Sequence, residues 1–152
     1  MLDLTQELRA IVAALDGAGV TYALAGGLAV SIYAVPRATQ DIDLLLAVPD
    51  LERATAAVRD LGFRIAGRPM RVAGGRLDIQ QLIKIEGADV LPLDLLLPRD
   101  QELAGILAAR THVTWEGTAL WIVTLPGLRS LKRLRDSAQD RADLEALGPK
   151  SS

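Results

Sequence analysis

Apolar residues recur at helical spacing near the N-terminus, between Leu4 and Leu15, and predict an amphipathic helix. Asp3 and Gln6 are placed as a capping pair at the start of this helix. Glycines at positions 17 and 19 favour its end. The chain is therefore expected to begin with a helix that buries one apolar face.

A second pattern follows between positions 22 and 36. The apolar run from Tyr22 to Ala25 predicts a short strand, and Gly26 and Gly27 predict a tight turn after it. The next eight residues, LAVSIYAV, have a helix-compatible composition, and Pro36 closes them. This segment is expected to fold as strand, turn and short helix.

The remaining pattern alternates strands with helices. It predicts a buried strand over residues 41–47, a helix over 50–61, a hairpin of runs 77–85 and 90–97 around a turn at 86–89, a helix over 100–110, a second hairpin of runs 113–115 and 120–123, and a helical tail from about Pro126. We therefore expect the α/β (α+β) class, with a mixed, mostly antiparallel sheet flanked by helices. We expect residues 1–152 to form a single domain.

Composition narrows the classes of function. The chain has 152 residues, of which 50% are hydrophobic and 24% charged, as is typical of a folded domain. Its net charge of −2 provides no chain-wide basic field for a long nucleic acid. It has no cysteine, which excludes disulfides and thiolate chemistry, and a lone His112 cannot build a histidine metal cluster. No signal-peptide pattern or bilayer-length apolar run is present, so a cytoplasmic protein without membrane contact is expected.

Aspartates that interrupt aliphatic strands are the strongest candidates for chemistry. Asp41 and Asp43 share one face of the strand predicted at 41–47. Two carboxylates about 6 Å apart repel by roughly 3 kcal/mol at an effective dielectric near 20, and a divalent cation would offset this. Asp94 interrupts a second aliphatic strand, where the hairpin register would pair it with Gln81. Asp78 is the rival candidate, in more polar surroundings.

Two further features are weaker when taken alone. The Gly26–Gly27 turn lies between a strand and a helix, where backbone amides can approach a phosphate closely. The stretch 61–77 carries four arginines and no acidic residue, so it is either an acceptor-binding lip or an arginine-rich surface loop. Those arginines are Arg64, Arg68, Arg71 and Arg76.

Taken together, these motifs resemble the nucleotidyltransferase superfamily with its polymerase-β-type core. The segments GGLA and RATQDIDLLL and the tail SLKRLRDSAQDRADLEAL look most like the AbiEii-like nucleotidyltransferases, a bacterial group that includes toxin components of toxin–antitoxin systems. The resemblance covers residues 22–147. It implies a catalytic core over about 22–124, followed by C-terminal helices over about 126–147.

The resemblance implies a role for each matching residue. Asp41 and Asp43 would ligate two Mg²⁺ ions, with Mn²⁺ as the alternative, and Asp94 would complete the metal site and favour deprotonation of the acceptor hydroxyl. The nucleotide would be held by Gly26, Gly27, Arg37, Thr39 and Lys132. A nucleoside monophosphate would then pass from a nucleoside triphosphate to an acceptor, which could be transfer RNA, a protein or a small molecule. An antitoxin or a second copy of the chain would be the expected protein partner.

Departures from the family pattern keep alternatives open. Gly27 stands where many members have a serine whose hydroxyl meets phosphate. Antibiotic-modifying nucleotidyltransferases of the lincosamide or aminoglycoside type also carry a Gly-Gly start and form the second hypothesis. A catalytically degenerate module that binds a nucleotide or a partner is the third. Lys132 also has a plainer interpretation, because a basic helix face is commonly solvated surface.

Overall fold

A mixed sheet forms the centre of the computed structural model, which describes residues 2–34, 41–135 and 138–148. Eight strands are present in these ranges, in the order β3-β5-β6-β2-β1-β8-β7 with β4 beside β5. Their bounds are β1 Tyr22–Ala25, β2 Ile42–Leu46, β3 Arg64–Ile65, β4 Met70–Val72, β5 Leu77–Glu86, β6 Asp89–Pro98, β7 Thr111–Trp115 and β8 Thr118–Ile122. The β2–β6 and β1–β8 pairs are parallel and the other five are antiparallel, which confirms the predicted mixed sheet.

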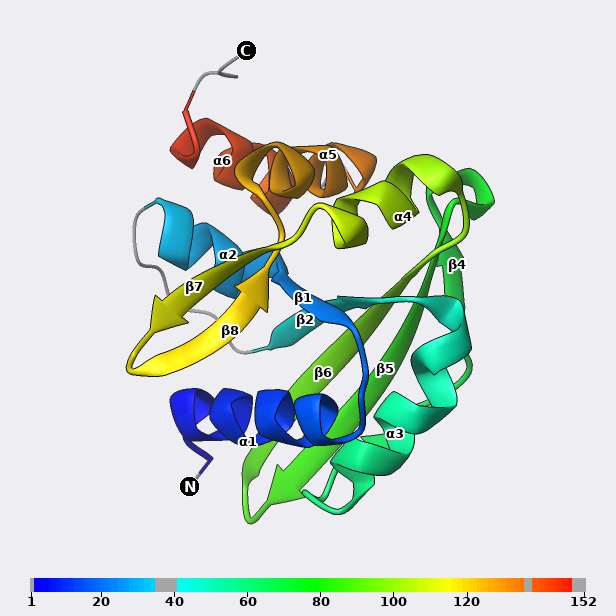
Figure 1. Cartoon of the computed structure of the whole chain (residues 1–152), viewed down its shortest axis with the longest axis vertical. Helices are drawn as coiled ribbons and strands as arrows, with labels where there is room; N and C mark the ends of the chain where they lie inside the picture. The colour runs from blue at the N-terminus through cyan, green and yellow to red at the C-terminus, as the bar shows by residue number, and fades with distance from the viewer. Residues whose placement is uncertain (1, 35–40, 136–137, 149–152) are drawn as a thin grey trace.

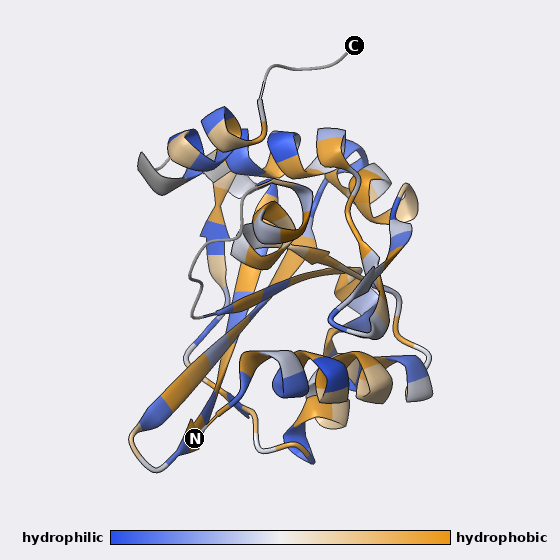
Figure 2. Cartoon of the chain, turned by 90° about the vertical axis from the view of Figure 1, so that its left-hand side faces the viewer, coloured by the Kyte–Doolittle hydropathy of each residue, from blue (hydrophilic) through white to orange (hydrophobic). Residues whose placement is uncertain are grey.

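Helices cover both faces of this sheet, as Figures 1 and 2 show. Helices α1 (Leu4–Gly17) and α3 (Leu51–Arg59) lie on one face, the latter preceded by the 3₁₀ turn η1 (Val48–Asp50). Helices α2 (Gly26–Tyr33), α4 (Gln101–Ala108), α5 (Leu125–Arg135) and α6 (Ala138–Ala146) lie on the other. No helix in the described ranges is long and apolar enough to cross a membrane.

The core explains why the two central strands have almost no polar side chains. All four residues of β1 and all five of β2 are buried, because these strands are covered on both faces. Asp43 is the one charged residue among these nine. Helix α1 contributes Leu8, Ile11 and Leu15 to the same core, and Asp3 caps it by accepting hydrogen bonds from the backbone N–H groups of the next turn.

The β5–β6 hairpin confirms the predicted register, while its turn is tighter than expected. Glu86 pairs with Asp89 inside the ladder, so the loop is two residues and not the predicted four. Charged side chains can take part in a ladder at an exposed tip because only their backbone atoms pair. Gly87 has a φ of +60°, which suits the first position of a two-residue hairpin turn. Along the ladder, Asp94 faces Gln81 as predicted.

Other elements differ from the prediction mainly at their ends. Helix α2 starts directly at Gly26, so the two glycines form its first turn and not a separate loop. The predicted helix at 50–61 spans Leu51–Arg59. Strands β3 and β4 and the 3₁₀ turn η2 (Ala73–Gly75) lie in the arginine-rich stretch, for which the sequence pattern predicted no strand.

Candidate active site

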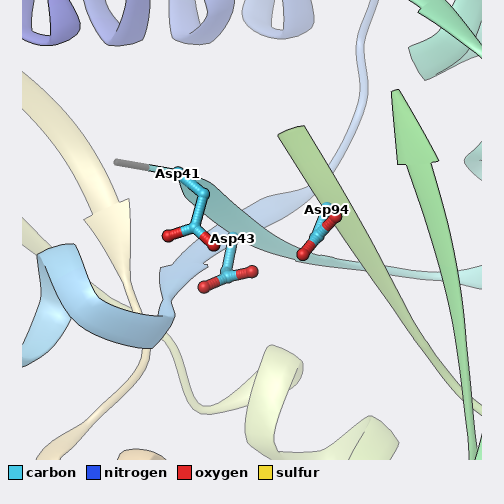
Figure 3. Close-up of side chains that lie close together, drawn as sticks. All are labelled: Asp41, Asp43 and Asp94. Carbon is cyan, nitrogen blue, oxygen red and sulfur yellow. The ribbon is translucent and has the colours of Figure 1, made fainter. Parts of the chain in front are cut away.

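Three carboxylates meet where β2 lies beside β6. Each of Asp41, Asp43 and Asp94 offers one oxygen, and these oxygens lie within 4.8 Å of one another. Figure 3 shows the three side chains on the same side of the two strands, with α2 beside them. Asp43 is buried, and the other two are partly exposed. The structure therefore brings together the three aspartates that the sequence singles out; we call them the aspartate triad.

Strand register places the triad. Asp43 and Asp94 are direct partners in the parallel β2–β6 ladder, so their side chains emerge side by side. Asp41 precedes β2 and lies two residues before Asp43, which puts it on the same face. A slip of one residue in the ladder would move Asp94 to the opposite face of the sheet. The aliphatic residues around each aspartate fix this register because their burial depends on it.

Gly26 brings the start of α2 against the triad. Its neighbour Ala25 pairs with Asp43 across the β1–β2 ladder, and Gly26 itself has a φ of +67°. A Cβ atom at Gly26 would lie 1.9 Å from Oδ2 of Asp43, far inside any real contact. Only glycine satisfies both the left-handed backbone and the close approach of the carboxylate. The glycine turn and the aspartate strand are thus parts of one site.

Gln81 supports Asp94 from the neighbouring strand. Its side-chain Nε2 donates a hydrogen bond of 3.1 Å to Oδ1 of Asp94, across the β5–β6 ladder. The sequence predicts the pairing of these two positions, and the structure adds the hydrogen bond. A donor on this oxygen restrains the rotation of the Asp94 carboxylate.

The electrostatics of the triad favour a bound cation. With oxygens within 4.8 Å, two ionised carboxylates repel by about 3 kcal/mol at an effective dielectric of about 20. The start of α2 offsets part of this repulsion, because its first backbone N–H groups carry partial positive charge. Carboxylate oxygens are the ligands that Mg²⁺ and Mn²⁺ prefer, and Mg²⁺ commonly uses one or two of them with substrate phosphates. The donor set fits a divalent cation.

The remaining residues predicted to bind nucleotide divide into three groups. Gly27 lies buried in the first turn of α2, next to the triad. Arg37 and Thr39 lie outside the described residues. Lys132 is buried in α5, and its ammonium lies 3.3 Å from Asp140 and 2.9 Å from Asp143 of α6. The interpretation of Lys132 as solvated surface is therefore wrong, while its contact with a nucleotide stays a prediction.

The Lys132 cluster has a structural consequence that the sequence pattern missed. Asp140 and Asp143 share one face of α6, and two acidic residues at this spacing are usually exposed. Both are buried, because α6 folds back on α5 and turns them towards Lys132. The i, i+3 spacing of the two aspartates was the available signal, since it places both beside one cation. The three charges tie the last two helices together.

Asp78 is not part of the triad. It lies on the opposite face of β5 from Gln81 and pairs with two arginines, at 3.0 Å from Arg71 and 3.1 Å from Arg99. The hydrogen bond from Arg71 holds the pKa of Asp78 below its usual range, and Arg99 adds to this effect. The rival candidate is therefore a member of an ion-pair network.

The arginine-rich stretch is largely committed to internal contacts. Arg71 binds Asp78, and Arg76 binds Asp100 and Glu102. Arg64 donates hydrogen bonds to the backbone carbonyls of Arg59 and Phe63. These contacts favour the surface-loop interpretation for three of the four arginines.

Comparisons with known proteins give the fold. No family model matches the chain, and no curated protein is similar to it in sequence. Among solved structures, the lincosamide antibiotic adenylyltransferase LnuA, with lincomycin bound, has a TM-score of 0.62 at 15% identity, covering 93% of this chain and 94% of that one. ANT(2")-Ia in complex with adenylyl-2"-tobramycin has a TM-score of 0.66 at 17% identity, covering 94% and 87%.

A Thermotoga maritima protein assigned as a nucleotidyltransferase is similar over most of both chains. Its TM-score is 0.58 at 17% identity, with 93% of this chain and 92% of that one covered. Together these likenesses show that the chain has the nucleotidyltransferase fold, as the sequence predicts.

Proposed function

We propose that this chain, which has the nucleotidyltransferase fold, is a metal-dependent enzyme that transfers a nucleoside monophosphate from a nucleoside triphosphate to a hydroxyl acceptor. The observation that carries the proposal is the aspartate triad beside the first turn of α2. A binding module has no need of three carboxylates within 4.8 Å of one another, which cost free energy unless a cation offsets their repulsion.

Each side chain then has a defined task. Asp41 and Asp43 would hold the divalent cations, Mg²⁺ or Mn²⁺. Such ions lower the pKa of a bound hydroxyl and stabilise charge on the transferring phosphate. The N–H groups at Gly26 and Gly27 would bind the phosphates, because the start of a helix attracts anions. Arg37, Thr39 and Lys132 are assigned to the nucleotide by family resemblance.

The reaction balances as an in-line displacement. The acceptor oxygen attacks the α-phosphorus, a new oxygen–phosphorus bond forms, and the bond to the pyrophosphate oxygen breaks. The hydroxyl proton passes to Asp94, which is partly exposed and held by Gln81. Pyrophosphate leaves with the electron pair of the broken bond.

Two more specific proposals differ in the molecule that accepts the nucleoside monophosphate. Motif resemblance to the AbiEii-like group supports a toxin of a toxin–antitoxin pair that modifies transfer RNA or protein, with an antitoxin or a second copy as partner. Structural likeness to LnuA and ANT(2")-Ia supports modification of a small antibiotic. Lincomycin and tobramycin are therefore the first small molecules to test as acceptors, beside transfer RNA and protein.

Calorimetric titration with the four nucleoside triphosphates tests the core of the proposal. We expect Mg²⁺-dependent binding of at least one of them to the unaltered chain, and loss of this binding in Asp41→Asn/Asp43→Asn. Asp60→Asn, an exposed carboxylate at the end of α3, is the matched control and should bind normally. Absence of binding to the unaltered chain, or equal binding to the double variant, would contradict the proposal and favour a degenerate module.

A further inference from the structure

The sheet face that carries the triad is only partly covered. Along β5, this face is buried at Ile79, with 8% exposure, exposed at Gln81, partly exposed at Ile83 and 63% exposed at Ile85. Along β6 it rises from 4% at Leu96 to 55% at Val90. The cover therefore thins at the Gln81–Asp94 pair, next to the triad, and the hairpin beyond it becomes open towards its tip, at Ile85 and Val90.

The open part is apolar. Its cross-strand pairs are Ile83 with Pro92 and Ile85 with Val90, all on the triad face of the hairpin. We call these four residues the hairpin patch. The same stretch of hairpin is covered on its other face, where Leu82, Leu91 and Leu93 are buried and Lys84 pairs with Glu7 of α1. Only one side of this hairpin is thus left without a partner among the described residues.

The charges around the patch argue against a polyanion. No Lys or Arg lies among the β5 and β6 residues of this face from the Gln81–Asp94 pair to the tip. The nearest cation in the described ladder is Arg64, the partner of Ile83, and its guanidinium is bound to two backbone carbonyls. Nucleic-acid binding needs several such cations to contact successive phosphates. The triad itself adds negative charge at one end of the patch.

The shape of the patch argues for a polypeptide. It runs four residues along β5 from Gln81 to Ile85, about 13 Å at the usual rise per strand residue. A small molecule is usually held in a concave pocket, whereas an open, pleated apolar surface suits a partner segment that lays several side chains across it. Ser, Thr and Tyr supply a hydroxyl within such a segment.

We infer that the hairpin patch is the docking surface of the acceptor, and that the acceptor is a protein segment carrying a hydroxyl between apolar residues. This inference rests on the proposed function, since it assigns the second substrate of the same site. Apolar side chains of the segment cover Ile85 and Val90, and its hydroxyl reaches Asp94 at the inner end of the patch. The proton of that hydroxyl passes to Asp94 while pyrophosphate leaves, as in the proposed reaction.

The test measures transfer of radiolabelled monophosphate from the nucleoside triphosphates to two defined probes. One is a set of synthetic peptides with Ser, Thr or Tyr flanked by apolar or by acidic residues, and the other is bulk bacterial transfer RNA. The variant is Ile85→Lys/Val90→Lys, at two positions whose side chains are more than half exposed. The matched control is Ile65→Lys, an equally exposed isoleucine that pairs with Leu82 on the other face of the sheet.

We expect label in the apolar-flanked peptides, a decrease of about tenfold or more in the double variant, and no decrease in the control. Nucleotide binding by calorimetry should be unchanged in both variants. Label in transfer RNA, especially with a gain in the lysine variant, would overturn the inference. So would equal labelling of peptides by all three proteins, or no peptide labelling with nucleotide binding intact. Failure of the unaltered chain to bind any nucleotide would instead overturn the proposed function.

Discussion

Gly26 offers the sharpest test of how the triad is built, through the substitution Gly26→Ala. The added methyl would lie 1.9 Å from Oδ2 and 2.6 Å from Cγ of Asp43. Asp43 has little room to move, because it is buried in a central strand. We therefore expect lower stability together with loss of metal-dependent nucleotide binding.

The expected loss of unfolding free energy in Gly26→Ala has two parts that can be measured separately. A left-handed backbone costs about 1–2 kcal/mol for a residue with a Cβ, and forced overpacking adds about 1–3 kcal/mol. Gly74 isolates the first part, because its φ of +66° matches the +67° of Gly26 and a Cβ there would meet nothing within 4 Å. Gly74→Ala should therefore lower the free energy of unfolding by about 1–2 kcal/mol, and Gly26→Ala by roughly 2–5 kcal/mol.

Urea denaturation followed by circular dichroism measures both variants under one set of conditions. The double variant Gly26→Ala/Asp43→Ala removes Oδ2 and Cγ and leaves Cβ of residue 43, at 2.8 Å, as the nearest atom of that side chain. Its destabilisation should fall short of the sum of the single effects by about 0.5–3 kcal/mol. Equal losses of unfolding free energy in Gly26→Ala and Gly74→Ala would refute the contact between the glycine and the carboxylate. So would a double variant whose loss equals the sum of the losses in Gly26→Ala and Asp43→Ala.

Three other predictions follow from the contacts described above. Gln81→Leu should slow nucleotidyl transfer about tenfold in steady-state assays with nucleotide affinity unchanged, because it removes a hydrogen bond that restrains the Asp94 carboxylate; an unchanged rate would show that Gln81 takes no part in the reaction. Lys132→Met should cost about 3–5 kcal/mol in urea denaturation because it leaves two carboxylates buried without their cation, and neutralising both of these in the same chain should restore most of the loss. Folding lowers the pKa of Asp78 from its unfolded value of 3.8. The ion pairs of Asp78 therefore stabilise the protein at pH values above 3.8, and this stabilisation is lost as the pH falls through the folded pKa. Asp78→Asn should flatten this acid limb in pH-dependent denaturation, and an unaltered limb would count against the ion pairs.

The aspartate strands could be predicted because each polar residue interrupts an aliphatic run. The spacing of Asp41 and Asp43 places both on one face, and the hairpin pattern pairs Asp94 with Gln81. Strand β6 lies beside β2 in a parallel pair, and the two strands are far apart in the chain. Local sequence pattern provides no signal for such a pair. The motif resemblance supplied that step by placing all three aspartates in one metal site.

The C-terminal helices show where local pattern was insufficient. Leu128 and Leu131 have the helical spacing that is typical of core residues, and both are buried. The burial of Lys132 was not predicted, because a charged residue is normally expected at the surface. Its position depends on Asp140 and Asp143 reaching it from another helix, so the charges are compensated only in the folded chain.

The parallel pairing of β2 with β6 also affects the order in which the chain assembles. The β5–β6 and β7–β8 hairpins close short loops, whereas docking β6 against β2 closes a long one and is expected to be slow. That same step brings Asp94 up to Asp41 and Asp43, so three like charges converge during the closure. A divalent cation that neutralises them would favour this late event. A divalent cation would then assist refolding of the chain in addition to the nucleotidyl transfer proposed above.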